Sequence, residues 1–205
     1  MMRRSAILLV LLTLRLAFPG EAFPYPVYFK EQYYKLFHLH YIQAPDDSIE
    51  NIYWLEQAKK SDFCNPLYAL SPIADKTQWE RYRYLLDMHL NLKLIEQHLV
   101  LGSKFDKRKA YFFNAPWRDQ NLESLKTAEA AYRAALLYWD ETRELAAKAM
   151  KMRWTYLEGS DAAYWIDEAA RIESGDLDYR DIIGDELGRL ERVRAEFLAM
   201  DASTY

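Results

Sequence analysis

The chain has 205 residues, of which 27 are Lys or Arg and 31 are Asp or Glu, so its net charge is −4 at pH 7. This mildly acidic balance does not suit a phosphate backbone and argues against a nucleic-acid-binding protein. Cys64 is the only cysteine, so the chain has no internal disulfide and must be held by its core. With 6 Gly, 7 Pro and 15% aromatic residues, the composition is typical of long helices that pack through aromatic side chains.

The N-terminus has the layout of a secretory signal peptide. A short basic start is followed by an apolar run over residues 6–14, and Gly20 and Ala22 are the small residues before a cleavage site at Phe23. The run ends at Arg15, short of the roughly 20 residues that cross a bilayer. We therefore predict that residues 1–22 are a signal peptide and that the protein is periplasmic; an uncleaved membrane anchor is the alternative.

Without residues 1–22 the chain keeps 24 basic and 30 acidic residues and a net charge of −6. Residues 23–205 are enough for a single domain with its own core. No later stretch is apolar enough to span a membrane, so no stable membrane span is expected after cleavage. One cysteine fits a bacterial periplasm better than a disulfide-rich extracellular setting.

Helical spacing of apolar residues recurs along the chain, and no alternating β-branched run predicts a strand. The predicted helices begin at cap signals such as Asp46, Asp47 and Ser48 after Pro45, and either Asp75 or Thr77, and one helix is expected to stop at Gly102. The sequence therefore predicts an all-α fold of stacked antiparallel helical hairpins, as an irregular bundle or a short solenoid. The predicted helices cover about 27–41, 48–60, 75–101, 121–158, 161–173 and 178–200, with short turns at 66–70 and 104–113.

The first predicted helix and the residues before it carry more aromatic side chains than one helix face can bury. Tyr and Trp are common anchors of protein interfaces, so this segment is the best candidate for a protein-binding surface. The competing interpretation is that aromatics at helical spacing form the core. The candidate interface residues are Tyr25, Tyr28, Phe29, Tyr33, Tyr34 and Phe37.

The sequence contains an internal echo, which is the first sign of a helical repeat. Residues 53–58 (YWLEQA) match residues 164–169 (YWIDEA) in type at every position, with an offset of 111. The expected packing places an Ala against a neighbouring helix, with an aromatic ring beside it; chance similarity between two amphipathic helices is the alternative. The predicted packing residues are Tyr53, Trp54, Ala58, Tyr164, Trp165 and Ala169, with Trp139 in a weaker third copy.

Residues that could bind a metal or act in catalysis are scattered along the chain rather than grouped. His38 and His40 point to different sides of a helix, and His89 and His98 lie nine residues apart, so no metal-ligand spacing is present. The motifs of phosphate-binding loops and nucleophile elbows are absent. We therefore predict a non-enzymatic protein with no catalytic residue, no metal and no cofactor. Asp176, Asp178 and Asp181 are expected to cap a helix rather than to bind calcium.

Two resemblances add to this interpretation. The stretch from Leu55-Glu56-Gln57-Ala58 to Asn65-Pro66 resembles the end of a tetratricopeptide-type hairpin, although the signature of its first helix is missing. The segments 29–34, 65–70 and 112–117 resemble a family of exported helical proteins of spirochaetes that includes components of the periplasmic flagellar motor collar. This resemblance implies a scaffold subunit whose partners are other proteins of an envelope assembly. The alternatives are a periplasmic module that binds a ligand in an aromatic pocket and a hydrolase with dispersed residues.

Overall fold

The computed structural model describes residues 26–201 and 204, so the predicted signal peptide and Tyr25 lie outside the described residues. Within the described part, the chain forms six α-helices and two short 3-10 helices and contains no strand. The predicted all-α fold is confirmed. The elements are α2 (Lys30–Gln43), α3 (Ser48–Lys60), η1 (Pro66–Tyr68), α4 (Lys76–Phe105), η2 (Phe112–Trp117), α5 (Arg118–Lys151), α6 (Ser160–Ser174) and α7 (Tyr179–Leu198).

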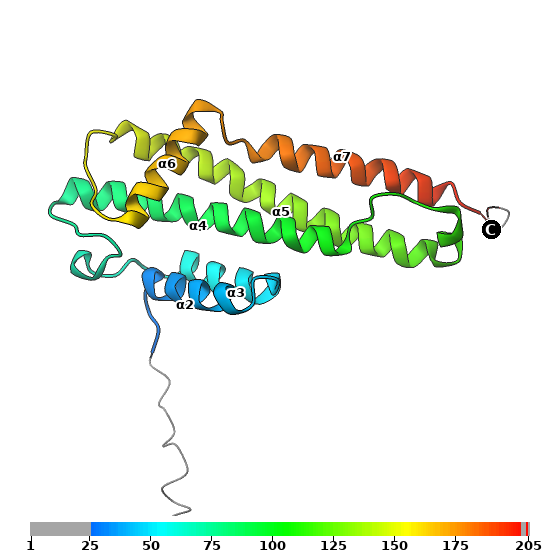
Figure 1. Ribbon diagram of the computed structural model, residues 1–205, viewed down its shortest axis with the longest axis horizontal. Coiled ribbons are helices and arrows are strands. Elements are labelled where there is room, and N and C mark those ends of the chain that lie inside the picture. The colour runs from blue at the N-terminus through cyan, green and yellow to red at the C-terminus, as the bar shows by residue number, and fades with distance from the viewer. Residues whose placement is uncertain (1–25, 202–203, 205) are drawn as a thin grey trace, which may run out of the picture.

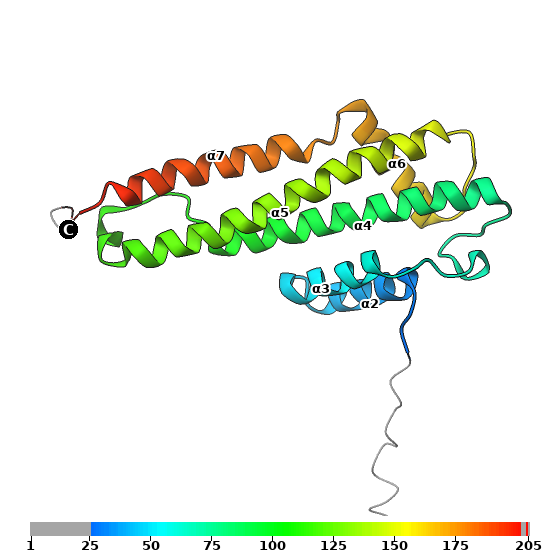
Figure 2. The ribbon, with the colours of Figure 1, turned by 180° about the vertical axis from the view of Figure 1, so that it is seen from behind.

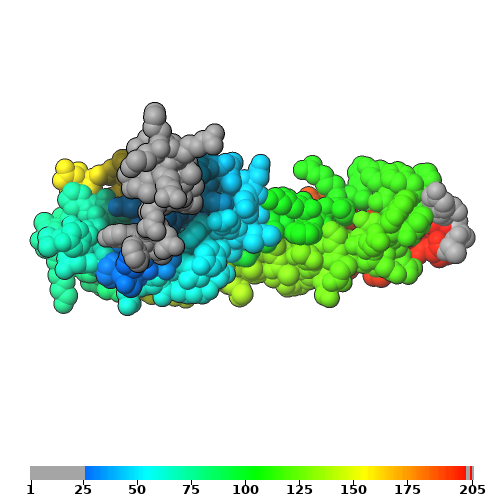
Figure 3. Space-filling model, turned by 90° about the horizontal axis from the view of Figure 1, so that it is seen from below, coloured from blue at the N-terminus to red at the C-terminus, as the bar shows by residue number. Residues whose placement is uncertain are grey.

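The two longest helices, α4 with 30 residues and α5 with 34, form an antiparallel hairpin that sets the long axis of the molecule (Figure 1). The α2–α3 hairpin packs along α4, with side-chain hydrogen bonds from Tyr82 to Lys104, and α7 lies along α5. Helix α6 crosses the hairpin obliquely and contacts both α4 and α5 (Figure 2). Seen from the side of the α2–α3 hairpin, this pair covers only one half of the long axis (Figure 3).

One hydrophobic cluster runs through all six helices and holds them together. Helix α4 supplies the largest share because it has neighbours on several sides, which explains why its apolar residues do not follow a single stripe. The members that mark each helix in turn are Tyr34, Leu55, Leu86, Trp139, Trp165 and Phe197.

Several helix ends follow the capping chemistry that the sequence predicts. Asp47 accepts a hydrogen bond from the backbone amide of Glu50, and Asp75, rather than Thr77, accepts one from that of Gln78 at 2.8 Å. Asp178 caps α7 in the same way, by accepting a hydrogen bond from the amide of Arg180 at 2.8 Å. The capping role expected for this acidic segment is therefore confirmed at Asp178.

The first helix begins at Lys30, three residues later than predicted. Phe29 and Asp62 form an isolated parallel bridge, in which the amide of Lys30 donates to the carbonyl oxygen of Asp62 at 2.8 Å. Pairing with a distant segment keeps the residues before Lys30 extended. The local helical pattern could not reveal this long-range contact.

The prediction that Gly102 ends a helix is wrong. Helix α4 continues to Phe105, and Gly102 lies inside it against the ring of Tyr132 on α5. A Cβ atom at Gly102 would lie 2.7 Å from Cδ1 and 2.9 Å from Cζ of Tyr132. The glycine is therefore required by close packing between two helices and not by a turn.

Helix α5 ends at Lys151, well before the predicted end at Glu158. Beyond it, Leu157 turns into the core with only 3% of its surface exposed. The buried Arg81 side chain of α4 donates to the carbonyl oxygens of Arg153 and Thr155 in this segment. These tertiary contacts satisfy carbonyl groups that a continued helix would have satisfied itself. The same helix begins at Arg118, ahead of the predicted start at Asn121.

Candidate functional site

Five of the six aromatic residues predicted as a protein interface lie within the described residues, and they separate into different environments. Tyr28 and Phe29 are exposed, with 65% and 38% of their surfaces accessible, and Tyr33 is half-buried. Tyr34 and Phe37 are buried on the side of α2 that faces α4 and α6, so neither side chain can meet a partner protein in this structure. Of these five described residues, only Tyr28 and Phe29, which precede the helix, keep the expected exposure.

The two copies of the internal echo lie on α3 and α6, and both of these helices contact α4. Ala58 and Ala169 are completely buried, while Tyr53 and Tyr164 are about half exposed. The copies differ at the Trp: Trp165 is buried and Trp54 is half-buried at the edge, where it donates to Glu50. Trp139 of the third copy is buried on α5, beside the ring of Tyr179.

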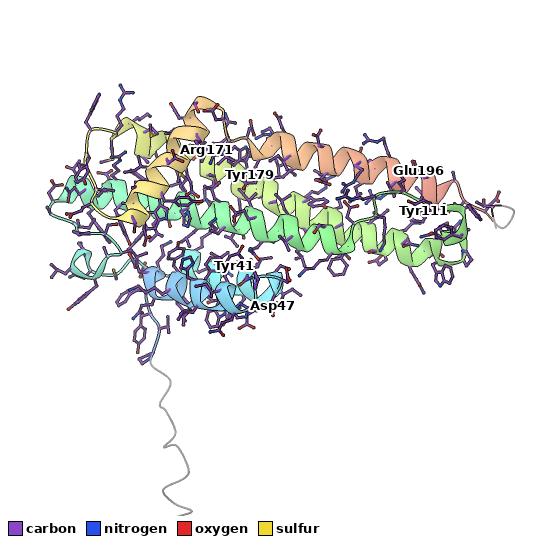
Figure 4. The ribbon with its side chains drawn as sticks, viewed as in Figure 1. Tyr41, Asp47, Tyr111, Arg171, Tyr179 and Glu196 are labelled. Carbon is purple, nitrogen blue, oxygen red and sulfur yellow. The ribbon has the colours of Figure 1, made fainter. Side chains whose placement is uncertain are left out.

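A pocket of about 250 Å³ lies between α2, α4 and α6. It brings together residues that the sequence analysis had assigned to two separate roles, Tyr34 and Phe37 of the proposed interface and Tyr164 and Trp165 of the echo. Figure 4 places Tyr41 in the same region, between the α2–α3 hairpin and α4 (Figure 4). We call it the aromatic pocket, and it is lined by Tyr34, Phe37, His38, Tyr41, His89, Lys93, Asp161, Tyr164 and Trp165.

The rings of the aromatic pocket meet at both steep and shallow angles, so they do not form one continuous stack. The planes of Tyr34 and Trp165 meet at 77°, and those of His89 and Tyr164 at 83°. The His38 ring lies parallel to that of Tyr34, with centroids 5.6 Å apart. Aromatic rings in several orientations therefore surround the space between the three helices.

A buried hydrogen-bonded chain runs behind the pocket from α6 through α4 to α2. Glu168 Oε2 lies 2.7 Å from His89 Nδ1, and His89 Nε2 lies 3.0 Å from the hydroxyl of Tyr34. The carboxylate can only accept, so Nδ1 carries a proton and Nε2 accepts from the Tyr34 hydroxyl when the imidazole is neutral. The three helices are thus joined by one polar chain inside an apolar core.

The charges around the pocket favour protonated phenols. Burial raises the pKa of Tyr34, and the nearby carboxylates of Asp161 and Glu168 raise it further. The Glu168 carboxylate also raises the pKa of Tyr164. Burial lowers the pKa of the Lys93 ammonium, but the Glu96 carboxylate 2.9 Å away outweighs this, so the net shift is upward. The pocket therefore holds neutral phenols and a Lys93 charge that Glu96 already offsets.

Sequence reasoning missed a second feature, the side of the α2–α3 hairpin that faces away from α4. The inner side of α2 buries Tyr34 and Phe37, yet its outer side also carries large apolar residues. The sequence of α2 could have indicated this face, because apolar residues occur on two sides of the helix and each apolar side of a helix is normally buried against a neighbour. We call this set the outer hairpin face, and it consists of Leu39, Ile42, Ile49 and Tyr53, exposed by 58%, 73%, 70% and 51%.

The His40, Asp47 and Glu50 cluster and the Cys64 thiol are two further groups of reactive side chains. His40, Asp47 and Glu50 have one ligand atom each within 4.8 Å of the others. Both carboxylates are exposed, and His40 already bonds to Asn51 through Nδ1 at 2.9 Å. Cys64 is buried, and burial together with the neighbouring Glu31 carboxylate raises its thiol pKa to about 12. A thiol with this pKa is not a nucleophile at neutral pH.

The fold and its features define an all-α protein with an aromatic pocket at the junction of three helices and an apolar face on its outer hairpin. The chain belongs to the family described as a domain of unknown function (DUF8513), whose model matches residues 77–200. The matched region covers α4 to α7, so one wall of the aromatic pocket, on α2, is formed outside it. No curated protein and no solved structure matches the chain.

None of the helices in residues 26–201 is both long enough and apolar enough to cross a bilayer.

Proposed function

We propose that this protein is a non-enzymatic binding subunit of a periplasmic assembly and that a partner protein covers the outer hairpin face. The observation that carries the proposal is the exposure of four large apolar side chains on one two-helix layer, Leu39 and Ile42 on α2 and Ile49 and Tyr53 on α3. Several large apolar side chains exposed on one layer are typical of an interaction site.

The energetic argument follows from the layer arrangement. Fully burying one large aliphatic side chain is worth about 1.5–3 kcal/mol, so a partner that covers this face gains several times that amount. The hairpin lies on one side of α4 and has no other element of the described chain on its outer side. With a partner bound, the α2–α3 hairpin would lie between α4 on one side and the partner on the other.

The buried polar chain beside the aromatic pocket has a structural role that needs no catalytic one. The Glu168–His89 pair points at a phenol, but burial raises the pKa of Tyr34 and opposes formation of a phenolate. The buried chain is accounted for by joining α2, α4 and α6, since buried polar groups need partners wherever they occur.

Compartment and assembly belong to the same proposal. Export to the periplasm rests on the signal-peptide-like residues 1–22, and a place in the spirochaete flagellar motor collar rests on the resemblance of three short segments. Protease treatment of cells with a permeabilised outer membrane tests the compartment. Degradation of the protein supports the periplasm, and protection until the inner membrane is lysed would contradict it.

Crosslinking in native cell envelopes, followed by mass spectrometry of purified complexes, tests the binding role. The informative variant is L39S/I42S/I49S on the outer hairpin face. The matched control is L137S/I182S/L198S, which removes three exposed aliphatic side chains from α5 and α7. We expect subunits of one envelope assembly to be recovered with the wild type and the control, and to be lost with the hairpin variant.

Two results would overturn this proposal. One is recovery of the same partners with the hairpin variant, which would place the interface elsewhere. The other is a monomeric wild-type protein that crosslinks to nothing, provided that circular dichroism shows all three forms to be folded.

The aromatic pocket favours a second candidate function, binding of a compact organic cation such as choline. Ring faces attract a quaternary ammonium group, and Asp161 and Glu168 give the site negative charge while Glu96 offsets Lys93. Calorimetry with choline and with its neutral carbon isostere tests this idea. Choline is expected to bind about tenfold tighter than the isostere, the difference that one cation–π contact of about 1.4 kcal/mol supplies.

Tyr164→Ala and Tyr53→Ala form a matched pair for the pocket. Both tyrosines are about half exposed and occupy equivalent positions in the internal echo, but only Tyr164 lines the pocket. Choline affinity should fall in Tyr164→Ala and stay unchanged in Tyr53→Ala. Equal affinity of the wild type for choline and the isostere would exclude the cation site.

A further inference from the structure

The connection between α4 and α5 runs to the end of the long axis that is farthest from the α2–α3 hairpin (Figure 1). At its start, Lys104 still donates to Ser48 of the hairpin at 3.2 Å. Residues 104–118 contain five basic residues and one acidic residue, a net charge of +4 in a chain whose net charge is −4. We call this segment the basic tip. The basic tip is opposite in charge to the rest of the chain. The molecule as a whole is therefore positive at the tip and negative elsewhere.

Four large aromatic side chains project from the basic tip into solvent. Tyr111, Phe112, Phe113 and Trp117 are exposed by 50%, 65%, 50% and 54%. The rings of Tyr111 and Phe113 stack with centroids 5.1 Å apart, and that of Phe112 meets Phe113 edge-on at 5.6 Å. The rings of Tyr111, Phe112 and Phe113 thus form a contiguous apolar cluster, and Trp117 adds a fourth exposed ring in the same segment.

The cluster is held outward by bonds at both ends of the connection. The hydroxyl of Ser124 donates to the carbonyl oxygen of Phe105 at 2.6 Å, and the amide of Ala110 donates to Glu196 of α7 at 3.3 Å. Figure 4 shows Tyr111 and Glu196 together at this end. Arg118 reaches the carbonyl oxygen of Met200 at 3.0 Å. The exposed rings therefore belong to a segment that is hydrogen-bonded to α5, α7 and the C-terminal residues.

The basic residues nearest to the aromatic cluster are free to meet an external anion. Lys107, Arg108 and Lys109 form no ion pair within the described residues. The one acidic residue of the tip, Asp106, is instead engaged by Arg189 of α7 and by the Tyr132 hydroxyl at 3.0 Å. Arg189 thus neutralises the Asp106 carboxylate, and the charge that the tip presents to solvent is positive.

We propose that the basic tip docks on an anionic membrane surface, with the aromatic cluster in the headgroup region and the long axis directed away from the bilayer. Tyr and Trp prefer this interface because their rings are apolar and their polar atoms stay wet. Basic residues add attraction to anionic lipids. The acidic remainder of the chain is repelled by the same surface, which selects docking through the tip. A partner protein of acidic chemistry is the alternative occupant, and the test distinguishes the two.

The test measures flotation of the full chain with vesicles of pure phosphatidylcholine and of phosphatidylcholine with phosphatidylglycerol. All variants carry the same N-terminal residues, so any vesicle binding by residues 1–22 is common to them. We expect binding to the anionic vesicles that weakens at high salt, because surface charge attraction is screened. K107Q/R108Q/K109Q should bind about 100-fold more weakly, from roughly fivefold per basic residue. F112S/W117S should also lose binding.

Matched controls lie at the opposite end of α5 and beyond it. R143Q/K148Q/K151Q removes three exposed basic residues, and W154S/Y156S removes two aromatic side chains exposed by 87% and 73%. Both controls should bind anionic vesicles like the wild type. Equal binding of the wild type to neutral and anionic vesicles would overturn the proposal, as would equal losses in the controls. Saturable binding of the tip to polyglutamate without vesicle binding would assign it to an acidic protein.

Discussion

Substitution of Gly102 by Ala tests the close contact between the two longest helices. Alanine normally stabilises a helix interior relative to glycine, by about 1 kcal/mol. At Gly102, however, the added methyl group would lie within 3 Å of Tyr132 ring atoms. That ring is buried, and its hydroxyl is bonded to Asp106 at 3.0 Å, so it cannot move aside freely.

The magnitude follows from two opposing contributions. Overpacking a tight core contact costs about 1–3 kcal/mol, and the helix propensity of alanine returns about 1 kcal/mol. Gly102→Ala should therefore lower the free energy of unfolding by up to about 2 kcal/mol. Gly184 in α7 has nothing within 4 Å of an added Cβ, so Gly184→Ala should raise it by up to about 1 kcal/mol. The difference between the two variants isolates the packing contribution.

Urea denaturation followed by circular dichroism measures both variants under one condition. A double-mutant cycle adds Tyr132→Leu, which removes the obstructing ring; Gly102→Ala should cost less in that background. The reasoning is refuted if Gly102→Ala stabilises the protein as much as Gly184→Ala does. It is also refuted if its cost is unchanged when Tyr132 is replaced.

Three further predictions concern buried polar groups. Burial lowers the pKa of His98, whose ring nitrogens have no hydrogen-bond partner among the described residues. The unfolded chain therefore binds more protons than the folded one, and the free energy of unfolding falls as the pH drops below about 6.5. The melting temperature of His98→Phe should fall less at acid pH than that of the wild type. His89→Leu leaves the Glu168 carboxylate buried without its partner and should cost about 3–5 kcal/mol in urea, whereas H89L/E168M should cost less. Because burial raises the Cys64 pKa to about 12, iodoacetamide should label it only as the protein unfolds, and rapid labelling at neutral pH in buffer would contradict that pKa.

Much of the fold could be predicted because local chemistry determines where helices start. An aspartate at Asp47, Asp75 or Asp178 supplies the acceptor that the first free amides need. Gly175, with φ of 82°, supplies the left-handed conformation that ends α6. The wrong boundaries lie where a distant residue intervenes, as Asp62 does at the start of α2 and Arg81 does after α5.

The aromatic pocket could be predicted only in part. The sequence indicated which aromatic residues matter, and it allowed an aromatic pocket as one interpretation. It assigned Tyr34 and Tyr164 to different roles, because they lie 130 residues apart and nothing local shows that α2 and α6 meet. The Glu168–His89–Tyr34 chain was missed for the same reason, since each member alone is an ordinary polar residue on an amphipathic helix.

The sequence by itself determined the helical class, the aspartate caps of three helices and the abundance of aromatic packing, because these depend on backbone chemistry and on neighbours within a few residues. Only the tertiary structure decided which aromatic side chains are buried and which are exposed. It placed Tyr34 in the core and Ile42 on the surface, although both lie on α2. Burial is a property of what packs against a helix, and for α2 that neighbour comes from residues far along the chain.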